Sequence, residues 1–359
     1  MRHRDDYEIC LFHSTHIDEI VDVLEYLWGN DKKGNLKHFD WKYIQNPYRK
    51  KPLGVVTLYK GKVVAFRGYF ATKWKTGARG NEILFLIPGD TVVHATHRKK
   101  GLSVAMGKFA MKEYEQHYRL FLNFTAWKNS APGYLRMGYK PLAEKAYMIR
   151  YKPFGLIKSI LAKKHIGRSG RGKITFGTFD TITVSDTPKP NEMSNIVSAT
   201  ENEDNKLQLV RDAEFYQWRF NSNKNRYVFY YDLGENEELQ GYVVLGIDEE
   251  KWWGGLLDFG ETDGHSITKI LTHIIKNEKI NALTIYNFSP TTEQLKIFEK
   301  TGFKRNTLER LVKKNILGEW PLYLRPIKAL PQENDWNLNG LDITKIENWN
   351  IKEICSDAV

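Results

Sequence analysis

The chain has few cysteines and no long apolar run, and each absence narrows the possible classes of protein. Cys10 and Cys355 are its two cysteines, so neither a disulfide framework nor a thiolate metal site is expected. No run of about 18 apolar residues occurs, and the start, Met1–Asp6, lacks the apolar stretch of a signal peptide. We therefore expect a cytoplasmic protein without a membrane span.

Acidic residues are also in deficit, because 43 Asp and Glu stand against 54 Lys and Arg, a formal net charge of +11. Such a charge attracts nucleic acid, an anionic membrane surface or phosphorylated small molecules, and does not choose among them. One basic cluster is interleaved with glycine and serine and has no hydrophobic period, which favours a solvated linker. Its members are Lys158, Lys163, Lys164, His165, Arg168, Arg171 and Lys173.

The 359 residues, of which 41% are hydrophobic, can bury a core and predict about two domains. Strand-like and helix-like patterns alternate in the first half, and Lys60-Gly61 is typical of a hairpin turn. A stretch rich in glycine, proline and charge marks a junction, and a second unit starts near Asn195. The expected strands are 7–12, 53–59, 62–70, 84–94 and 120–125, and the expected helices are 17–27, 102–117 and 133–137.

The two halves contain similar segments in the same order, which predicts an internal repeat. The first pair of segments shares the order aromatic, any residue, Trp, basic residue, aromatic. The second pair shares the dipeptide Gly-Tyr. In the third pair, an aromatic residue is followed by Gly and then by a second aromatic residue. Chance similarity between aromatic-rich segments is the alternative. The matched pairs are 39–43 with 216–220, 66–70 with 239–243, and 134–140 with 298–304.

The segment from Thr91 to Val104 places a β-branched run before a basic loop and a helix start. A helix N-terminus leaves backbone N–H groups unpaired and carries about half a positive charge, so it can hold a pyrophosphate. Gly101 lets the backbone approach the phosphates, and the basic side chains before it add charge. The segment predicts a site for a phosphorylated cofactor, with a phosphate-free helix start as the alternative.

This loop resembles that of the GNAT superfamily of acetyl-coenzyme A-dependent acyltransferases, which reads Arg or Gln, two residues, Gly, one residue, and Gly or Ala. Residues 98–103 read RKKGLS, with Ser103 at the last position, and Ala95 stands where many members have proline. Residues 129–139, NSAPGYLRMGY, resemble the family's later segment, an Asn near a helix start followed by Tyr and then Gly with an aromatic. The resemblance covers roughly residues 7–150, with a weaker echo over 195–325.

The resemblance implies an α/β fold of two GNAT-like domains, each a mostly antiparallel twisted mixed sheet flanked by helices. It implies acetyl-CoA, or another acyl-CoA, as the donor, and no metal. The residues implied to bind the donor are Val92, Val93 and His94 along the pantetheine arm, Arg98, Lys99, Lys100, Gly101, Leu102, Ser103 and Val104 at the pyrophosphate, and Asn129.

The resemblance also places Tyr134 beside the sulfur, where a phenol can protonate the departing thiolate as general acid. The alternative is a tyrosine packed at a helix end. Asp90, on the strand that would hold the donor, is one candidate base, and it is equally a turn residue that bonds its own backbone. His94 is the other, because imidazole titrates near neutral pH; a strand histidine facing a neighbour is its alternative.

The second half lacks two of these features. Residues 260–266 are acidic where a basic loop would follow the strand, and Phe298 stands in the place of Tyr134. We therefore expect one active site per chain, with the second half lending a wall to the acceptor pocket. The expected division is a catalytic domain at 1–154, a linker at 155–194, a degenerate GNAT-like domain at 195–330 and a C-terminal extension at 331–359.

Three hypotheses for function follow. The leading one is an N-acetyltransferase acting on a primary amine, such as an amino sugar or a polysaccharide precursor. The second is a FemAB-like transferase that draws an aminoacyl group from charged tRNA, and the intact coenzyme A-type loop argues against it. The third is a non-catalytic, basic nucleic-acid-binding protein, whose affinity would fall steeply with salt. We expect a small-molecule acceptor, no nucleic-acid partner, and a monomer or dimer.

Overall fold

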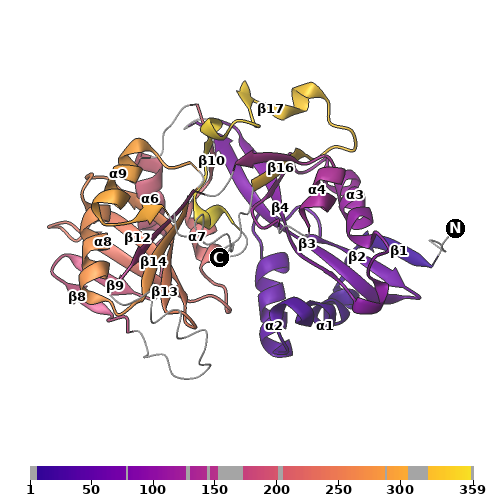
Figure 1. The fold of residues 1–359 in the computed structure, drawn as a ribbon, viewed down its shortest axis with the longest axis horizontal. Coiled ribbons are helices and arrows are strands. Elements are labelled where there is room, and N and C mark those ends of the chain that lie inside the picture. Colours follow the sequence, from indigo (N-terminus) through magenta and orange to yellow (C-terminus); the bar gives the residue numbers. More distant parts are fainter. Residues whose placement is uncertain are drawn as a thin grey trace.

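The chain forms two units, each built on a large mixed β-sheet flanked by helices, as predicted (Figure 1). The computed structural model describes residues 6–77, 80–126, 130–143, 146–152, 173–200, 205–287, 289–305 and 322–356. Most of the basic cluster predicted as a linker, and Asn129, therefore lie outside the described residues.

Sheet A, in the first unit, has the strand order β1-β2-β3-β4-β5-β16-β6, with β10 (Leu207–Leu209) beside β3 and β19 (Trp349–Asn350) beside β10. The strands of the first half are β1 (Tyr7–Leu11), β2 (Gly54–Tyr59), β3 (Lys62–Thr76), β4 (Glu82–Val93), β5 (Leu120–Asn123) and β6 (Lys140–Ala143). Its helices are α1 (Ile17–Trp28), α2 (Lys32–Phe39), the π-helical turn η2 (Asp40–Ile44), α3 (Leu102–Tyr114) and α4 (Ala131–Arg136), with 3-10 turns η1 (Ser14–His16) and η3 (Ala95–His97).

Local sequence explains several of these elements. Lys60 and Gly61 have φ values of 50° and 76°, the doubly positive pattern of the tight turn that matches strand twist in a hairpin. Helix α1 buries Ile20, Val21 and Leu24 completely, as its 3.6-residue period predicts. The hairpin and α1 therefore form where the sequence places them.

Sheet B, in the second unit, has the order β15-β7-β14-β13-β12-β11-β9-β8. Its strands are β7 (Ala146–Tyr151), β8 (Gly177–Phe179), β9 (Ile182–Ser185), β11 (Tyr227–Leu233), β12 (Leu239–Asp248), β13 (Trp253–Glu261), β14 (Ala282–Asn287) and β15 (Lys304–Arg305). Its helices are α6 (Pro190–Thr200), α7 (Ala213–Arg219), α8 (Ser266–Asn277) and α9 (Thr292–Lys300). The C-terminal part adds β16 (Leu322–Pro326), β17 (Asn337–Leu338), β18 (Leu341–Asp342) and the turns η4 (Glu333–Trp336), η5 (Ile346–Asn348) and η6 (Glu353–Cys355).

The main strand order of each sheet includes one strand from the other part of the chain. In sheet A, β16 from the C-terminal part lies between β5 and β6; in sheet B, β7 from the first half lies between β14 and β15. Figure 1 shows the exchange as a yellow strand among the indigo and purple strands of the first unit. In the main order of both sheets the inserted strand follows a parallel pair, β4–β5 or β13–β14, so the two halves have equivalent strand orders around it.

The two units contact each other through equivalent tryptophans. Trp41 and Trp218 are both buried, and their rings stack with centroids 5.7 Å apart. The Trp41 Nε1 donates to the Trp218 carbonyl oxygen at 2.7 Å, and the Trp218 Nε1 donates to the Trp41 carbonyl oxygen at 3.0 Å. The first segment match read from the sequence thus contains residues that meet across the interface with reciprocal contacts.

Three expectations about boundaries and matches differ from the structure. Strands β8 and β9 and much of α6 lie in the range expected to be a linker, because short strands next to glycine and proline carry little periodic signal. The segment expected as a C-terminal extension at 331–359 packs into the core, with Trp349 and Ile351 fully buried. The sequence match pairs Arg67 with Gln240. In the sheets, however, the residue equivalent to Arg67 is Val244, because each is the last paired residue before a bulge.

Two features are absent from the described part of the chain. None of its helices is both long and apolar enough to cross a membrane. It also holds no group of three or more His, Cys, Asp or Glu side chains placed to bind a metal ion. Cys355 is buried, which raises the pKa of its thiol to about 12, so it is an unreactive core residue.

Candidate active site

One part of the candidate site is an open edge of strand β4. Within the described residues β4 pairs with β5 only at Phe85 and Leu86, so residues 87–93 continue beyond the last pair. The backbone groups on that side are then free of a ladder partner, which suits an extended amide chain that can bond to a strand edge. Val93 faces the opening, whereas Val92 is 4% exposed.

The basic loop after β4 ends at the N-terminus of α3. Gly101 is the N-cap of α3 with φ 78°, and an added Cβ would meet no atom within 4 Å; the glycine is therefore required for its backbone angle. The first intrahelical bond runs from the Ala105 N–H to the Gly101 carbonyl oxygen. The N–H groups of Leu102, Ser103 and Val104 have no acceptor in the described part of the chain, which leaves an anion site.

The basic side chains of the loop are exposed and fixed by local contacts. Arg98 Nε donates to the Val93 carbonyl oxygen at 3.0 Å, and Lys100 Nζ donates to Tyr7 Oη at 2.7 Å. The same Tyr7 Oη lies 2.9 Å from His97 Nδ1. Partial burial, then the charges of Lys100 and His94, lower the pKa of His97, so a bound anion would raise it again.

Tyr134 lies on α4, across from this helix start. Its side chain is 7% exposed, its ring centroid is 5.0 Å from that of Tyr139, and the Arg67 guanidinium lies 5.1 Å from its ring. Helix α4 ends at Arg136, and Gly138, two residues later, has a φ of 83° that turns the chain toward β6. The ring of Tyr134 is thus held by contacts with Tyr139 and with the Arg67 guanidinium.

One pocket of about 430 Å³ joins these parts. It brings together most of the residues that the sequence assigned to the donor and the assigned acid, and it adds Arg67, Thr91, His97 and Met137. The assigned residues that line it are Val93, Arg98, Lys99, Lys100, Gly101, Leu102, Ser103, Val104 and Tyr134. The arrangement can hold a pyrophosphate at the helix start and place a thioester near a phenol.

Asp90 lies outside this pocket. It is the extra residue of a β-bulge, since Arg67 pairs with Thr91 and Gly68 with Gly89, and its φ is 32°. Its carboxylate accepts from Lys42 Nζ at 2.7 Å, Tyr43 Oη at 2.5 Å and Trp28 Nε1 at 3.2 Å.

These partners decide the proton affinity of Asp90. Burial raises the pKa of the carboxyl group, but the charge of Lys42 and the hydrogen bonds from Lys42, Tyr43 and Trp28 lower it by more, so it lies below its usual value. A carboxylate with three donors and a depressed pKa is a weak base. The geometry favours a fixed negative charge at this position over a proton acceptor.

His94 is also separate from the pocket lining. Its Nδ1 lies 2.8 Å from Thr96 Oγ1, and its ring is 6.0 Å from that of Tyr26. This matches the alternative of a histidine that contacts its neighbours. Its ring also lies 6.0 Å from that of His97, which lines the pocket.

Arg67 is a buried charged residue of the pocket that sequence reasoning missed. It lies in the middle of the apolar strand segment 63–71 and is 1% exposed. The sequence signal that could have found it is an arginine on an otherwise apolar strand. A buried arginine normally has a partner, so such a residue indicates a site.

The equivalent helix start in the second unit is closed by acidic side chains. Asp263 Oδ1 accepts from the N–H groups of His265 at 2.9 Å and Ser266 at 3.0 Å, and Glu261 Oε2 accepts from the Ile267 N–H at 2.7 Å. The N-terminus of α8 therefore has its own anions. At the bulge of β13 the residue is Leu257, and Phe298 on α9 is 1% exposed.

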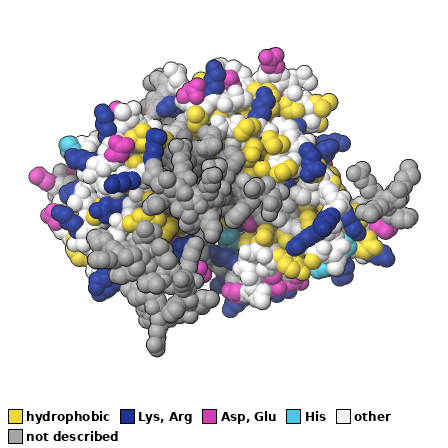
Figure 2. Space-filling view, viewed as in Figure 1, with side chains coloured by type: hydrophobic (Ala, Val, Ile, Leu, Met, Phe, Trp, Pro, Cys, Tyr) yellow, Lys and Arg dark blue, Asp and Glu magenta, His cyan; other side chains and the backbone are white. Residues whose placement is uncertain are grey.

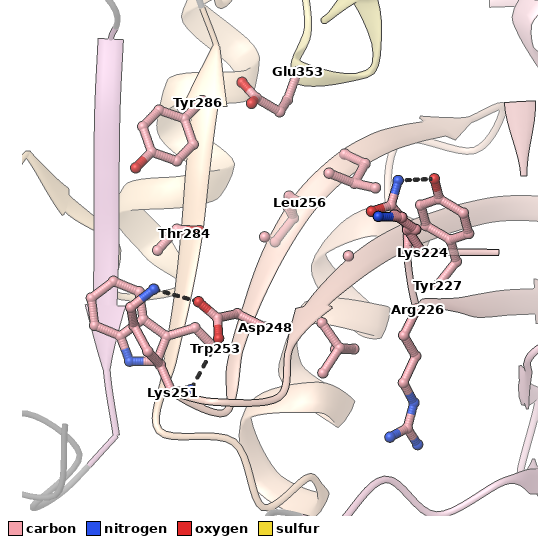
Figure 3. Close-up of a pocket in the computed structure, with 15 residues that line it drawn as sticks. Lys224, Arg226, Tyr227, Asp248, Lys251, Trp253, Leu256, Thr284, Tyr286 and Glu353 are labelled. Atoms are coloured by element: carbon pink, nitrogen blue, oxygen red, sulfur yellow. Dashed lines mark hydrogen bonds and ion pairs between the residues drawn. The ribbon is translucent and has the colours of Figure 1, made fainter. Parts of the chain in front are cut away.

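A second pocket, of about 310 Å³, lies on β11 to β14 of sheet B (Figure 3). Gly246 and Gly255, which pair across β12 and β13, are among its lining residues. Figure 3 shows Trp253 and Tyr286 on one side and Lys224 with Tyr227 on the other. This pocket offers aromatic faces together with charged groups.

Lys224 connects this second pocket to the first unit. Its Nζ lies 2.6 Å from Asn35 Oδ1 and 3.1 Å from the Trp28 carbonyl oxygen, and Trp28 in turn donates to Asp90. The bulge of β4 and the pocket on sheet B thus border the same junction between the units.

Comparison with known proteins identifies the first unit. Residues 8–142 match the family model described as an acetyltransferase (GNAT) domain. No curated protein matches the sequence.

Solved structures share the fold over both units. The GCN5-related N-acetyltransferase from Anabaena variabilis ATCC 29413 gives a TM-score of 0.58 at 12% identity, over 90% of this chain and 73% of that chain. The GCN5-related N-acetyltransferase from Kribbella flavida gives 0.53 at 11% identity, over 90% and 73%. Saccharomyces cerevisiae N-myristoyltransferase with bound myristoyl-CoA gives 0.53 at 12% identity, over 91% and 81%. At these identities the likeness concerns the fold.

Proposed function

We propose that the chain transfers an acetyl or related acyl group from acyl-CoA to a primary amine, because residues 8–142 match a GNAT acetyltransferase domain. The observation that carries the proposal is the first pocket, in which an open helix N-terminus, a basic loop and Tyr134 share one cavity. Fold likeness alone would not specify chemistry, whereas these groups match the parts of a thioester donor.

The donor's pyrophosphate binds the N–H groups at the start of α3, with Arg98, Lys99 and Lys100 adding positive charge. Its pantetheine arm extends along the open edge of β4, past Val93 toward the bulge. Rim charges of this kind raise the association rate and make affinity depend on salt. The positive surface visible on both units in Figure 2 acts in the same direction.

Transfer proceeds by direct attack. The amine nitrogen bonds to the thioester carbonyl carbon, the carbon–sulfur bond breaks, and the thiolate takes the Tyr134 proton. The proton lost by the amine passes to water, because Asp90 is too weak a base to hold it, and water returns a proton to Tyr134 after the transfer. Asp90 instead attracts the acceptor as a fixed anion beside the bulge.

The acceptor lies at the junction of the units, with its amine near the bulge of β4 and its body in the pocket on sheet B. Trp253 and Tyr286 offer faces on which a sugar ring stacks, and Glu353 and Lys224 offer polar partners. An amino sugar, or a polysaccharide precursor that carries one, fits this combination. The cytoplasm, where such precursors are made, is the location we propose.

The second unit serves as a wall and is a degenerate copy of the first. Equivalent strand orders, the reciprocal Trp41–Trp218 contacts and the paired bulges support a duplication. The division into units at 1–154 and 195–330 then describes the repeated sequence, while β7 and β16 cross between the sheets. Acidic closure of α8 accounts for the loss of donor binding in the second copy.

Release of free thiol from acetyl-CoA, measured with the full chain and a panel of primary amines, tests the proposal. We expect thiol release that requires both an amine and the protein, with the N-acetyl product seen by mass. Trp253→Ala should raise the KM for the best amine without changing the Kd for acetyl-CoA. Absence of thiol release with donor bound and amino sugars in excess would contradict the proposed acceptor class.

A further inference from the structure

Arg67 is a buried cation without an anion. Its Nε donates to Tyr69 Oη at 3.0 Å, and its Nη1 reaches the Ser103 carbonyl oxygen at 3.5 Å and Ser103 Oγ at 3.4 Å. Its Nη2 is buried and has no hydrogen-bond partner among the described residues. No carboxylate in the described part of the chain forms an ion pair with it.

An uncompensated buried charge is costly, so such a group is retained where a ligand supplies the partner. Arg67 does not become neutral on burial. Burial lowers the pKa of its guanidinium, but the interactions with Tyr134, Tyr69 and Tyr139 raise that pKa by more, so the net shift is upward. The guanidinium therefore stays charged. The missing partner is an anion or a strong acceptor.

The position of Arg67 shows which part of the donor it faces. Arg67 lines the first pocket and pairs with Thr91, two residues before Val93 and therefore about 7 Å further along β4 from the basic loop. It lies 5.1 Å from the ring of Tyr134, the residue proposed to meet the sulfur. Arg67 thus lies between Ser103 at the start of α3 and the ring of Tyr134, on the side of the pocket where the acyl end of the donor would meet the tyrosine.

The second unit supplies a comparison. The residue before its bulge is Val244, opposite Asp258, in the unit whose helix start is closed by carboxylates. A structural need of the fold would apply to both units. The arginine instead occurs in the unit that keeps the open phosphate site.

We propose that Arg67 binds a carboxylate on the acyl group, so that the donor is a coenzyme A monothioester of a short dicarboxylic acid. This rests on the proposed function and names its donor class. The amine nitrogen bonds to the thioester carbonyl carbon, the carbon–sulfur bond breaks, and sulfur takes the Tyr134 proton. The far carboxylate keeps its charge throughout, and the product is an amide with a free acid.

Calorimetric titration of the full chain with succinyl-CoA, butyryl-CoA and CoA tests the proposal, because the first two have four-carbon acyl groups that differ at the far end. A charge-assisted hydrogen bond to Arg67 predicts succinyl-CoA binding about ten- to hundred-fold tighter than butyryl-CoA. In Arg67→Met this preference should vanish while the Kd for CoA stays within about two-fold. Arg98→Met, the control at the phosphate end, should weaken all three alike.

Equal or tighter binding of butyryl-CoA by the wild-type chain would overturn the proposal, and so would an Arg67→Met variant that loses all three ligands equally. The ratio of the Kd values for butyryl-CoA and succinyl-CoA is measured on the wild-type chain, so the proposal can be tested even where Arg67→Met fails to fold. Binding of CoA with no succinyl preference overturns only this inference. Failure of every thioester and of CoA itself to bind would count against the proposed function.

Discussion

The two units offer a matched pair of glycines for testing the phosphate site. Gly101 and Gly264 precede equivalent helices, have φ values of 78° and 72°, and leave no atom within 4 Å of an added Cβ. Gly101→Glu and Gly264→Glu therefore add the same charge under the same backbone strain, about 1–2 kcal/mol for an L-residue in this region. Both variants should lose similar folding stability, which thermal unfolding measures.

Only Gly101→Glu should lose the donor. Its carboxylate would reach the N–H groups of Leu102 and Ser103, as Asp263 does at α8, and would face the pyrophosphate. Two unit charges about 4 Å apart at an effective dielectric near 20 repel by about 4 kcal/mol. Screening at this exposed rim reduces the repulsion to about 2–3 kcal/mol, which weakens the Kd for acetyl-CoA by about 30- to 150-fold.

Calorimetric titration of both variants with acetyl-CoA gives the comparison. The reasoning would be refuted by a Gly101→Glu variant that binds as tightly as the wild type, or by an equal loss in Gly264→Glu with its fold intact. An equal loss in Gly264→Glu would mean that the second unit takes part in donor binding.

Three further predictions concern Tyr134, Asp90 and the interface. Tyr134→Phe keeps the ring but removes the proton, so kcat should fall by about 100-fold or more with the Kd for acetyl-CoA unchanged; an unaltered kcat would remove Tyr134 from the mechanism. Asp90 has a lowered pKa in the folded state, so its carboxylate stabilises the fold above the unfolded-state pKa of about 3.9, and this is lost as pH falls through the folded value. Urea unfolding should then show a steeper loss of stability between pH 6 and pH 3 in the wild type than in Asp90→Asn, and identical slopes would contradict the ion pair. Trp218→Phe leaves the buried Trp41 carbonyl oxygen without its indole donor and should lower the free energy of unfolding by about 1–3 kcal/mol, whereas no change in the urea midpoint would mean the reciprocal contact contributes nothing.

Features set by neighbours in the sequence could be predicted. The hairpin at Lys60-Gly61, the apolar face of α1 and the succession of β4, basic loop and α3 each depend on local chemistry, namely turn angles, helical period and a glycine N-cap. The acidic closure of α8 was also readable, because Asp263 lies three residues before Ser266, within reach of its N–H.

Features set by distant segments could not be predicted. The exchange of β7 and β16 depends on pairing between strands from opposite ends of the chain, as in Tyr323 with Asn123, and neither strand carries a mark of its partner. The environment of Asp90 required the bulge that turns it toward Lys42 and Tyr43. The burial of Arg67 required β3, α3 and α4 to enclose it together.

The central claim is that one donor site exists per chain, at the start of α3 and not at α8. Calorimetric titration of the wild-type full chain with acetyl-CoA measures the number of sites directly. The account predicts a stoichiometry of about one per chain, with an affinity that weakens as salt rises, because the loop charges are exposed. Two sites per chain, or none, would contradict it.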